Sequence, residues 1–244
     1  MFENKWDKEK EKEALKKFSK KSISLEHALR TYSSRLIGSE KDLVMHGGGN
    51  TSCKTVYRKI FNNKINVMCI KGSGWDLDTI EPAGLPAVRL DPLLRLQKLK
   101  ALSDLDMINI LRSNLIDSNS PNPSIETLVH AFLPATFIDH THASPFLTLA
   151  NLPNAKKIMV EIFGDKMAFV PYVMPGFELS KAVAKIFDKQ EKAEGLLLEK
   201  HGHFTWGDTA KTSYNKVIDQ TNMVEDWLQS KRKLTTYLAK KLDK

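Results

Sequence analysis

Apolar side chains recur along this chain with two periods, one of three to four residues and one of two. The clearest helical stretch follows Ser24, a residue suited to cap a helix N-terminus, and runs to Gly38, where a helix can end. Helical spacing is also expected in residues 3–18, 92–100, 104–115, 124–134, 155–163, 177–188 and from 209 to past 228. Short apolar or alternating runs predict strands in residues 43–45, 55–61, 65–70, 88–90, 137–142, 167–173 and 195–199.

The runs 55–61 and 65–70 bear on the type of sheet. Asn62 and Asn63 lie between them and favour a tight hairpin turn. Because a hairpin joins antiparallel strands, a purely parallel sheet is disfavoured. The pattern predicts an α/β fold with a mixed or antiparallel central sheet and helices on its faces. We expect residues 1–22 to form a charged N-terminal helix or extension and residues 23–244 a single domain, since no repeat or linker divides them.

The formal net charge of +8 lies at the two ends of the chain. Residues 1–22 hold eight lysines and five acidic residues, and residues 231–244 hold six basic residues and one acidic residue. A nucleic-acid interface needs basic side chains on the folded body, so this function is disfavoured. No apolar run approaches the roughly 20 residues that cross a bilayer, and no apolar leader is present. With only two cysteines, Cys53 and Cys69, interpreted as buried small side chains, we expect a cytoplasmic protein without a membrane partner.

Three histidines form the candidate metal centre. His140 and His142 are two apart on a predicted strand, so both point to the same face, roughly 7 Å apart. His201 follows the apolar run 195–199, and Gly202 after it would allow a sharp turn. Three histidine ligands with open positions are typical of a catalytic metal site.

The other histidines have weaker claims. Glu126 and His130 are four apart on a predicted helix and share one side of it. We interpret His130 as a core residue or a residue behind the ligands. For His203 a surface or substrate-facing position is as well supported as ligation. His27 falls on the polar side of its helix, and His46 adjoins a glycine loop in which it can be structural.

Three loops could bind an anion. Residues 47–52 read GGGNTS, which fits neither a dinucleotide-binding fingerprint nor a Walker loop but exposes backbone N–H groups and small donors. Residues 71–74, KGSG, offer the same chemistry with one cation, and Pro123–Ser124 stands at a predicted helix N-terminus. Any one of these could be an ordinary turn. Together, beside three histidines, they predict a phosphate site.

The ordered set of these motifs resembles the class II aldolases of the aldolase/adducin superfamily over about residues 25–230. The motifs are GGGNTS (47–52), KGSGWDL (71–77), PNPSIE (121–126), DHTHA (139–143) and KHGHFTWGD (200–208). YSSRLIG (32–38), GSGWDLDTIEPAG (72–84) and AVRLDPLL (87–94) are similar to the aldolase half of bifunctional rhamnulose-1-phosphate aldolase/alcohol dehydrogenases. Those relatives continue into a dehydrogenase domain, which this chain does not include.

The resemblance implies a three-layer α/β/α sandwich around a largely antiparallel sheet, and a homo-oligomer, often a tetramer. It implies that His140, His142 and His201 hold Zn²⁺ or another divalent metal and that Glu126 is the catalytic acid/base. The implied phosphate and substrate contacts are Gly49, Asn50, Ser73, Gly74 and Ser124. Related fuculose-phosphate aldolases also use a tyrosine from a neighbouring subunit, and Tyr172 lies in the matching region without aligning to it.

The implied reaction is cleavage of a ketose 1-phosphate, similar to rhamnulose 1-phosphate, to dihydroxyacetone phosphate and a short aldehyde. Alternatives on the same scaffold are a sugar-phosphate dehydratase and a 4-epimerase. Relatives that epimerise usually carry Asp in place of Glu126, which disfavours the epimerase. A non-catalytic adducin-like binding module is the alternative of another class, and the presence of the three histidines favours an enzyme.

Overall fold

The computed structural model describes residues 1–19, 23–58, 63–190 and 192–242, with side chains described up to residue 232. Its strands form one seven-stranded sheet in the order β3-β2-β1-β4-β7-β6-β5. The strands are β1 (Asn50–Arg58), β2 (Lys64–Ile70), β3 (Ala87–Arg89), β4 (Phe137–Thr141), β5 (Met167–Val170), β6 (Gly195–Leu198) and β7 (Gly202–Gly207). All neighbouring strands are antiparallel except β5 and β6. The expected mixed, mostly antiparallel sheet is confirmed.

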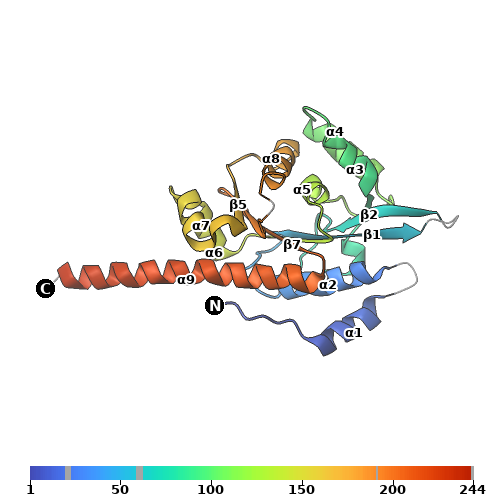
Figure 1. The fold of residues 1–244 in the computed structure, drawn as a ribbon. Helices are drawn as coiled ribbons and strands as arrows, with labels where there is room; N and C mark the ends of the chain where they lie inside the picture. Colours follow the sequence, from blue (N-terminus) through green and yellow to red (C-terminus); the bar gives the residue numbers. More distant parts are fainter. Residues whose placement is uncertain (20–22, 59–62, 191, 243–244) are drawn as a thin grey trace.

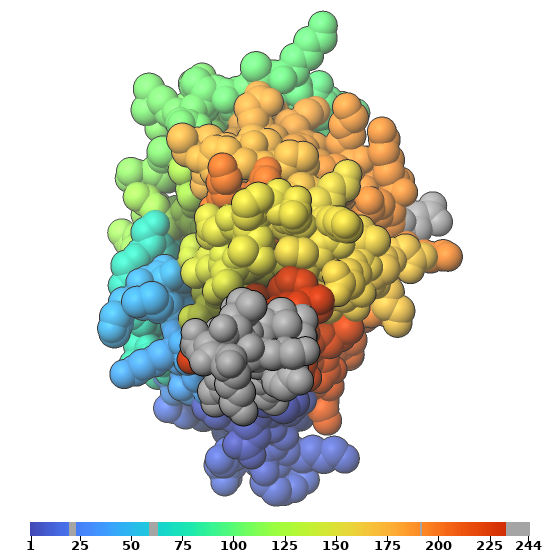
Figure 2. Space-filling view, turned by 90° about the vertical axis from the view of Figure 1, so that its left-hand side faces the viewer, coloured from blue at the N-terminus to red at the C-terminus, as the bar shows by residue number. Residues whose placement is uncertain are grey.

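Helices lie on both sides of this sheet (Figure 1). The helices are α1 (Lys8–Phe18), α2 (Leu25–Gly38), η1 (Pro82–Gly84), α3 (Leu90–Leu96), α4 (Asp104–Ser113), α5 (Thr127–Phe132), α6 (Ser144–Ala150), α7 (Ala155–Phe163), η2 (Gly164–Lys166), α8 (Phe177–Phe187) and α9 (Ala210–Leu242). One side carries α2 and α9, with α1 packed outside α2, and the other carries α3, α5 and α8. In the view turned by 90°, α7 in yellow and α8 in orange cover one end, between α1 in blue and α4 in green (Figure 2). No described helix combines the length and apolar character needed to cross a membrane.

A buried ion pair joins the central strand β4 to the helices beneath it. Arg30 of α2 and Asp139 of β4 have no exposed side-chain surface, and their charged atoms lie 2.6 Å apart. Ser213 of α9 donates a hydrogen bond from its Oγ to Asp139 Oδ2 (2.5 Å). Because side chains alternate along a strand, His140 beside Asp139 points to the opposite face, toward α5. The pair therefore fixes the strand that presents the first histidine.

The termini of several elements differ from those that the sequence predicts. Residues 43–45 form no strand: Leu43 ends a turn and the next two residues are irregular, although Leu43 and Val44 are buried. β1 begins at Asn50, five residues before the predicted start, because its small polar residues pair with β4. β5 ends before Pro171, which has no backbone N–H to donate. The antiparallel pairing of β1 with β2 is confirmed; Asn62, in the predicted turn, lies outside the described residues.

Besides the short 3₁₀ turns η1 and η2, one strand and one α-helix have no counterpart in the prediction, and several helices, α5 among them, are shorter than expected. The strand β7 and the helix α6 were not expected. The helix predicted for residues 124–134 is α5, which begins at Thr127, so Glu126 occupies its N-cap and not its interior. The N-terminal extension contains α1, whose Ala14 and Phe18 are buried against α2.

Candidate metal centre

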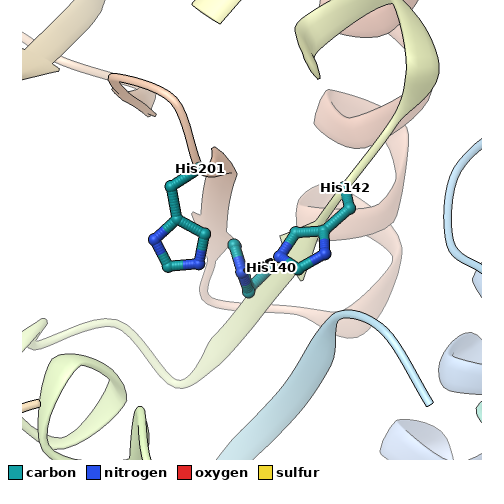
Figure 3. A group of neighbouring side chains, drawn as sticks. All are labelled: His140, His142 and His201. Carbon is teal, nitrogen blue, oxygen red and sulfur yellow. Dashed lines mark hydrogen bonds between the residues drawn. The ribbon is translucent and has the colours of Figure 1, made fainter. Parts of the chain in front are cut away.

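The structure brings together the three histidines of the predicted metal centre (Figure 3). His140 lies in β4, and His142 follows just beyond the end of that strand. His201 lies in the turn between β6 and β7. Because β7 runs antiparallel to β4, this turn lies beside the end of β4, where His140 and His142 are. One ring nitrogen from each histidine lies within 4.8 Å of those of the other two, and the Nε2 atoms of His140 and His142 are 3.0 Å apart.

The protonation of these rings suits metal binding. His140 Nδ1 lies 3.1 Å from the backbone oxygen of His203. Because a carbonyl only accepts, Nδ1 carries the proton, and the lone pair of Nε2 points into the cluster. Burial lowers the pKa of all three rings, and the neighbouring histidines add to this effect at His140 and His201. Together they bring the pKa of His140 well below its usual range and that of His201 to about 4. Neutral imidazoles are the form that binds Zn²⁺ or a similar divalent cation.

Gly202 leaves the space that the cluster needs. A Cβ atom at this position would lie 2.7 Å from the backbone oxygen of Thr141, and 2.9 Å from ring carbons of both His140 and His142. The tight turn itself is made by Lys200, whose φ is 55°. The expectation that Gly202 serves the turn is therefore wrong: its missing side chain makes room for two histidines.

Glu126 faces two of the histidines. Its Oε2 lies 3.4 Å from His140 Nε2, and its Oε1 lies 3.3 Å from His201 Nε2. The side chain is buried, and Oε1 has no hydrogen-bond partner among the described residues. Burial raises the pKa of Glu126 to about 7, against the lowering effects of the Asn50 hydrogen bond and the Lys71 charge. A carboxyl group that is half protonated near neutral pH can both take and give a proton there.

A chain of buried polar groups holds Glu126 from behind. Asn50 Nδ2 donates to Glu126 Oε2 (2.7 Å), and Asn50 Oδ1 lies 2.5 Å from His130 Nε2. His130 Nδ1 in turn lies 2.8 Å from Ser52 Oγ. Since the amide oxygen can only accept, His130 donates from Nε2 and accepts at Nδ1 from the Ser52 hydroxyl. His130 is confirmed as a residue behind the cluster, whereas Ser52 was not expected there.

The three predicted anion loops lie side by side. The backbone N–H of Ser73 donates to Asn122 O (2.8 Å), and that of Ser124 donates to Lys71 O (3.2 Å). Lys71 Nζ donates to Gly47 O (2.8 Å), which connects the first loop to the second. The Ser124 hydroxyl also lies 3.2 Å from Asn50 Nδ2, next to Glu126. The loops are therefore adjacent to one another and to the histidine cluster.

The two glycines among the predicted contacts differ in their surroundings. Gly49 has φ +62°, and a Cβ there would lie 2.7 Å from the His140 backbone oxygen, so only glycine fits. Gly74 has φ +84° with nothing within 4 Å, and both it and Ser73 are exposed. Gly74 and Ser73 thus line the open side of the loops.

The remaining candidates lie outside the cluster. His203 is fully buried on the other face, where it is stacked on Phe146 and bonded to Gln220 (2.7 Å), so both roles expected for it are wrong. His27 is not on a polar face but turns inward toward Cys69. His46 is exposed. The Tyr172 side chain is half exposed, and its hydroxyl lies 3.8 Å from Met174 Sδ.

Comparison with known proteins assigns this chain to a family. The sequence matches the family model described as Class II Aldolase and Adducin N-terminal domain over residues 30–228. It is 41% identical over 200 residues to a Bacillus subtilis (strain 168) protein named Uncharacterized oxidoreductase YuxG. That match covers 82% of this chain but only 29% of the relative, so the chain spans less than a third of it.

Solved structures agree with the sequence match. The N-terminal class II aldolase domain of a conserved protein from Thermoplasma acidophilum has a TM-score of 0.81 and 34% identity, over 93% of this chain and 100% of that one. A sugar-phosphate aldolase from Thermotoga maritima has a TM-score of 0.60 and 16% identity, over 82% and 93% of the two chains. An L-fuculose 1-phosphate aldolase has a TM-score of 0.57 and 20% identity, over 86% of this chain and 89% of that one. At identities as low as those of the last two structures, the likeness is one of fold. The family match over most of the chain and the identity to the Thermoplasma domain show that this protein belongs to the class II aldolase and adducin N-terminal domain family.

Proposed function

We propose that the protein is a metal-dependent aldolase that cleaves a ketose 1-phosphate, similar to rhamnulose 1-phosphate, to dihydroxyacetone phosphate and a short aldehyde. The observation that carries the proposal is the position of Glu126, with one carboxylate oxygen 3.4 Å from His140 Nε2 and the other 3.3 Å from His201 Nε2. A buried carboxyl group beside convergent neutral imidazoles is suited to proton transfer next to a cation.

His140, His142 and His201 are the proposed ligands of the metal, which we take to be Zn²⁺. The donor set fits, since three neutral ring nitrogens within 4.8 Å of one another leave other coordination positions open. When bound, the cation supplies positive charge that stabilises negative charge developing on the oxygen atoms of the substrate. The His203 backbone oxygen holds the His140 ring in the orientation that directs Nε2 into the cluster.

Glu126 is the proposed acid/base. In the cleavage direction the substrate hydroxyl that becomes the aldehyde oxygen gives up its proton as the carbon–carbon bond breaks, and the Glu126 carboxyl group gives a proton to the carbon atom from which the aldehyde has departed. In the synthetic direction both proton movements are reversed. Asn50 holds Oε2 through its amide N–H and leaves Oε1 free to exchange the proton.

The substrate phosphate is assigned to the three adjacent loops. Gly49, Asn50, Ser73, Gly74 and Ser124 supply backbone N–H groups, an amide and two hydroxyls as the proposed contacts. The contacts between the loops support this assignment, because they hold the loops against one another with Asn50 and the Ser124 hydroxyl beside Glu126. Binding of the phosphate fixes the reacting carbon against the carboxyl group, which is catalysis by positioning.

Further features of the family are proposed with it. These are the three-layer α/β/α sandwich, a cytoplasmic location and a homotetramer. Tyr172 is half exposed, which suits a hydroxyl offered to the site of a neighbouring copy. In Figure 1 the end of α9 extends beyond the body of the protein, where another copy can contact it. Light scattering at micromolar concentration should give four times the chain mass, and a fully active monomer would exclude a site shared between copies.

The reaction is tested with the zinc-loaded protein and a panel of ketose 1-phosphates. An assay coupled to a reductase specific for dihydroxyacetone phosphate should report cleavage of at least one of them, and mass spectrometry of the products should show the matching aldehyde. Dehydration or epimerisation without carbon–carbon cleavage would be compatible with the proposed phosphate site but would exclude aldolase activity. Equal cleavage of the free sugars would show that the loops are ordinary turns.

A further inference from the structure

A cavity lies on the face of the sheet opposite to the histidine cluster. It has a volume of about 330 Å³ and lies among α2, β1, β2, η1 and residues 116–120. Ser52 of β1 points to His130 on the cluster side, so the next residue, Cys53, points to the α2 side. The side chains of Cys69 and His27 form part of the cavity wall. The proposed aldolase chemistry uses neither of them.

Cys69 and His27 have the geometry of a thiol with its base. Cys69 Sγ lies 3.5 Å from His27 Nδ1, and His27 Nε2 lies 3.0 Å from the backbone oxygen of Pro82. Because this carbonyl can only accept, Nε2 carries a proton and Nδ1 is free to take the proton of the thiol. A nucleophile, a base within hydrogen-bonding reach and a third group that orients the base are the parts of an activated thiol.

A second thiol stands directly across from the first. Cys53 of β1 and Cys69 of β2 are paired in the antiparallel ladder, and both are free and buried. Directly opposed residues in such a ladder have Cα atoms roughly 4.5–5.5 Å apart, which lies within the span of a disulfide. The pair can therefore close without movement of either strand to a new register.

The two thiols differ in acidity. The hydrogen bond from Cys53 and the charge of His27 lower the pKa of Cys69 to about 5, against the raising effect of burial. Burial raises the pKa of Cys53 well above its usual value. The other charged groups around the pair are Glu26, which acts on both thiols, and Arg30, which lowers the pKa of Cys53. Cys69 is therefore the more acidic of the two thiols.

We propose that Cys69, His27 and Cys53 form a reactive-thiol site in this cavity that takes a small hydroperoxide. His27 takes the proton of the Cys69 thiol, and the thiolate attacks one peroxide oxygen. The S–O bond forms as the O–O bond breaks, sulfur is oxidised by two electrons, and His27 returns its proton to the departing hydroxide, giving water. The Cys53 thiol then attacks the sulfenic acid, which forms the Cys53–Cys69 disulfide and releases a second water. Hydrogen peroxide is small enough to enter this cavity, whose lining includes Cys69.

The test treats the whole protein with hydrogen peroxide at pH 6 and follows both cysteines by mass spectrometry. The wild type should lose two hydrogen atoms in mass and yield a linked pair of peptides containing Cys53 and Cys69. Cys53→Ser should stop at a sulfenic acid on Cys69, which dimedone traps. His27→Gln should slow oxidation of Cys69 by roughly tenfold, since it removes the base that favours the thiolate. His46→Gln, which changes an exposed histidine elsewhere, should react like the wild type.

Three results would overturn the proposal. They are trapping of Cys53 in preference to Cys69, an unchanged rate in folded His27→Gln, and oxidation that occurs only after urea unfolds the protein. If circular dichroism shows that His27→Gln does not fold, the test is instead a comparison of the oxidation rates of the native and the urea-unfolded wild type. At pH 6 its native thiol should react roughly tenfold faster than the same thiol in urea, and an equal or slower native rate contradicts the site.

Discussion

Substituting alanine for Gly202 should damage the metal centre while leaving the fold in place. The added Cβ would lie 2.7 Å from the backbone oxygen of Thr141 and 2.9 Å from ring carbons of His140 and His142. Ordinary carbon–carbon contacts are about 3.5–4.0 Å, so these neighbours must each retreat by at least about half an ångström. Metal–ligand distances tolerate shifts of only about 0.2 Å. The strain therefore falls on the two rings that share the cation.

We expect the dissociation constant for Zn²⁺ to rise by about 10- to 100-fold in Gly202→Ala, the range seen when groups that orient ligands are lost. Overpacking should also lower the free energy of unfolding by about 1–3 kcal/mol. Competition with a chromophoric chelator measures the first quantity, and urea unfolding of the metal-free protein measures the second.

Gly207→Ala is the matched control. Gly207 lies on the same strand, and its Cβ would be 2.9 Å from Ser213 N and 3.0 Å from Thr212 Cβ, with no histidine nearby. The control should lose stability without loss of zinc affinity. If both variants bind zinc as tightly as the wild type, Gly202 does not shape a metal site and the reasoning is refuted.

Three further predictions concern the carboxyl group, the phosphate loops and the buried ion pair. Glu126→Gln should retain zinc and lose about 10²- to 10⁴-fold in kcat, and near wild-type turnover would remove Glu126 from the mechanism. Ser73→Ala should lower kcat/KM for a ketose 1-phosphate by roughly ten- to a hundredfold and change little for the free sugar; an equal loss for both would separate Ser73 from the phosphate. Asp139→Asn leaves the Arg30 charge buried without its partner, so urea unfolding should show a loss of about 3–5 kcal/mol. Asp165 forms an exposed ion pair with Lys192, so Asp165→Asn should lower the free energy of unfolding very little. Similar losses in Asp139→Asn and Asp165→Asn would contradict the structural role of the buried pair.

The sequence predicts the parts of this site whose signals are local. The spacing of His140 and His142 is enough to predict that both rings lie on one side of the sheet, and the structure brings their ring nitrogens together although His142 follows the end of β4. His201 follows from its position after the apolar run that becomes β6. The hairpin of β1 and β2 is also local, since the two runs are separated by a short polar segment.

The rest depends on contacts between distant segments. The start of β1 reads as a loop because Asn50 and Ser52 are polar, yet pairing with β4 buries both. Ser52 and His130 meet across 78 positions of the chain, which no periodicity reveals. β7 was missed because Gly202 and Gly207 interrupt the apolar pattern, while its register with β4 and β6 makes it a strand. Glu126 was placed inside a helix because the turn of α5 begins one residue after it.

A zinc titration of the metal-free protein, read as the rate of dihydroxyacetone phosphate release from rhamnulose 1-phosphate, tests the metal centre and the reaction together. We expect no activity after chelation, a linear rise of the rate with added zinc, and a plateau at about one equivalent of zinc per chain. In the same titration the His140→Ala/His201→Ala double variant should stay inactive. Full activity of the chelated wild type, or a plateau reached equally by the double variant, would contradict the assignment of the three histidines as the centre of an aldolase.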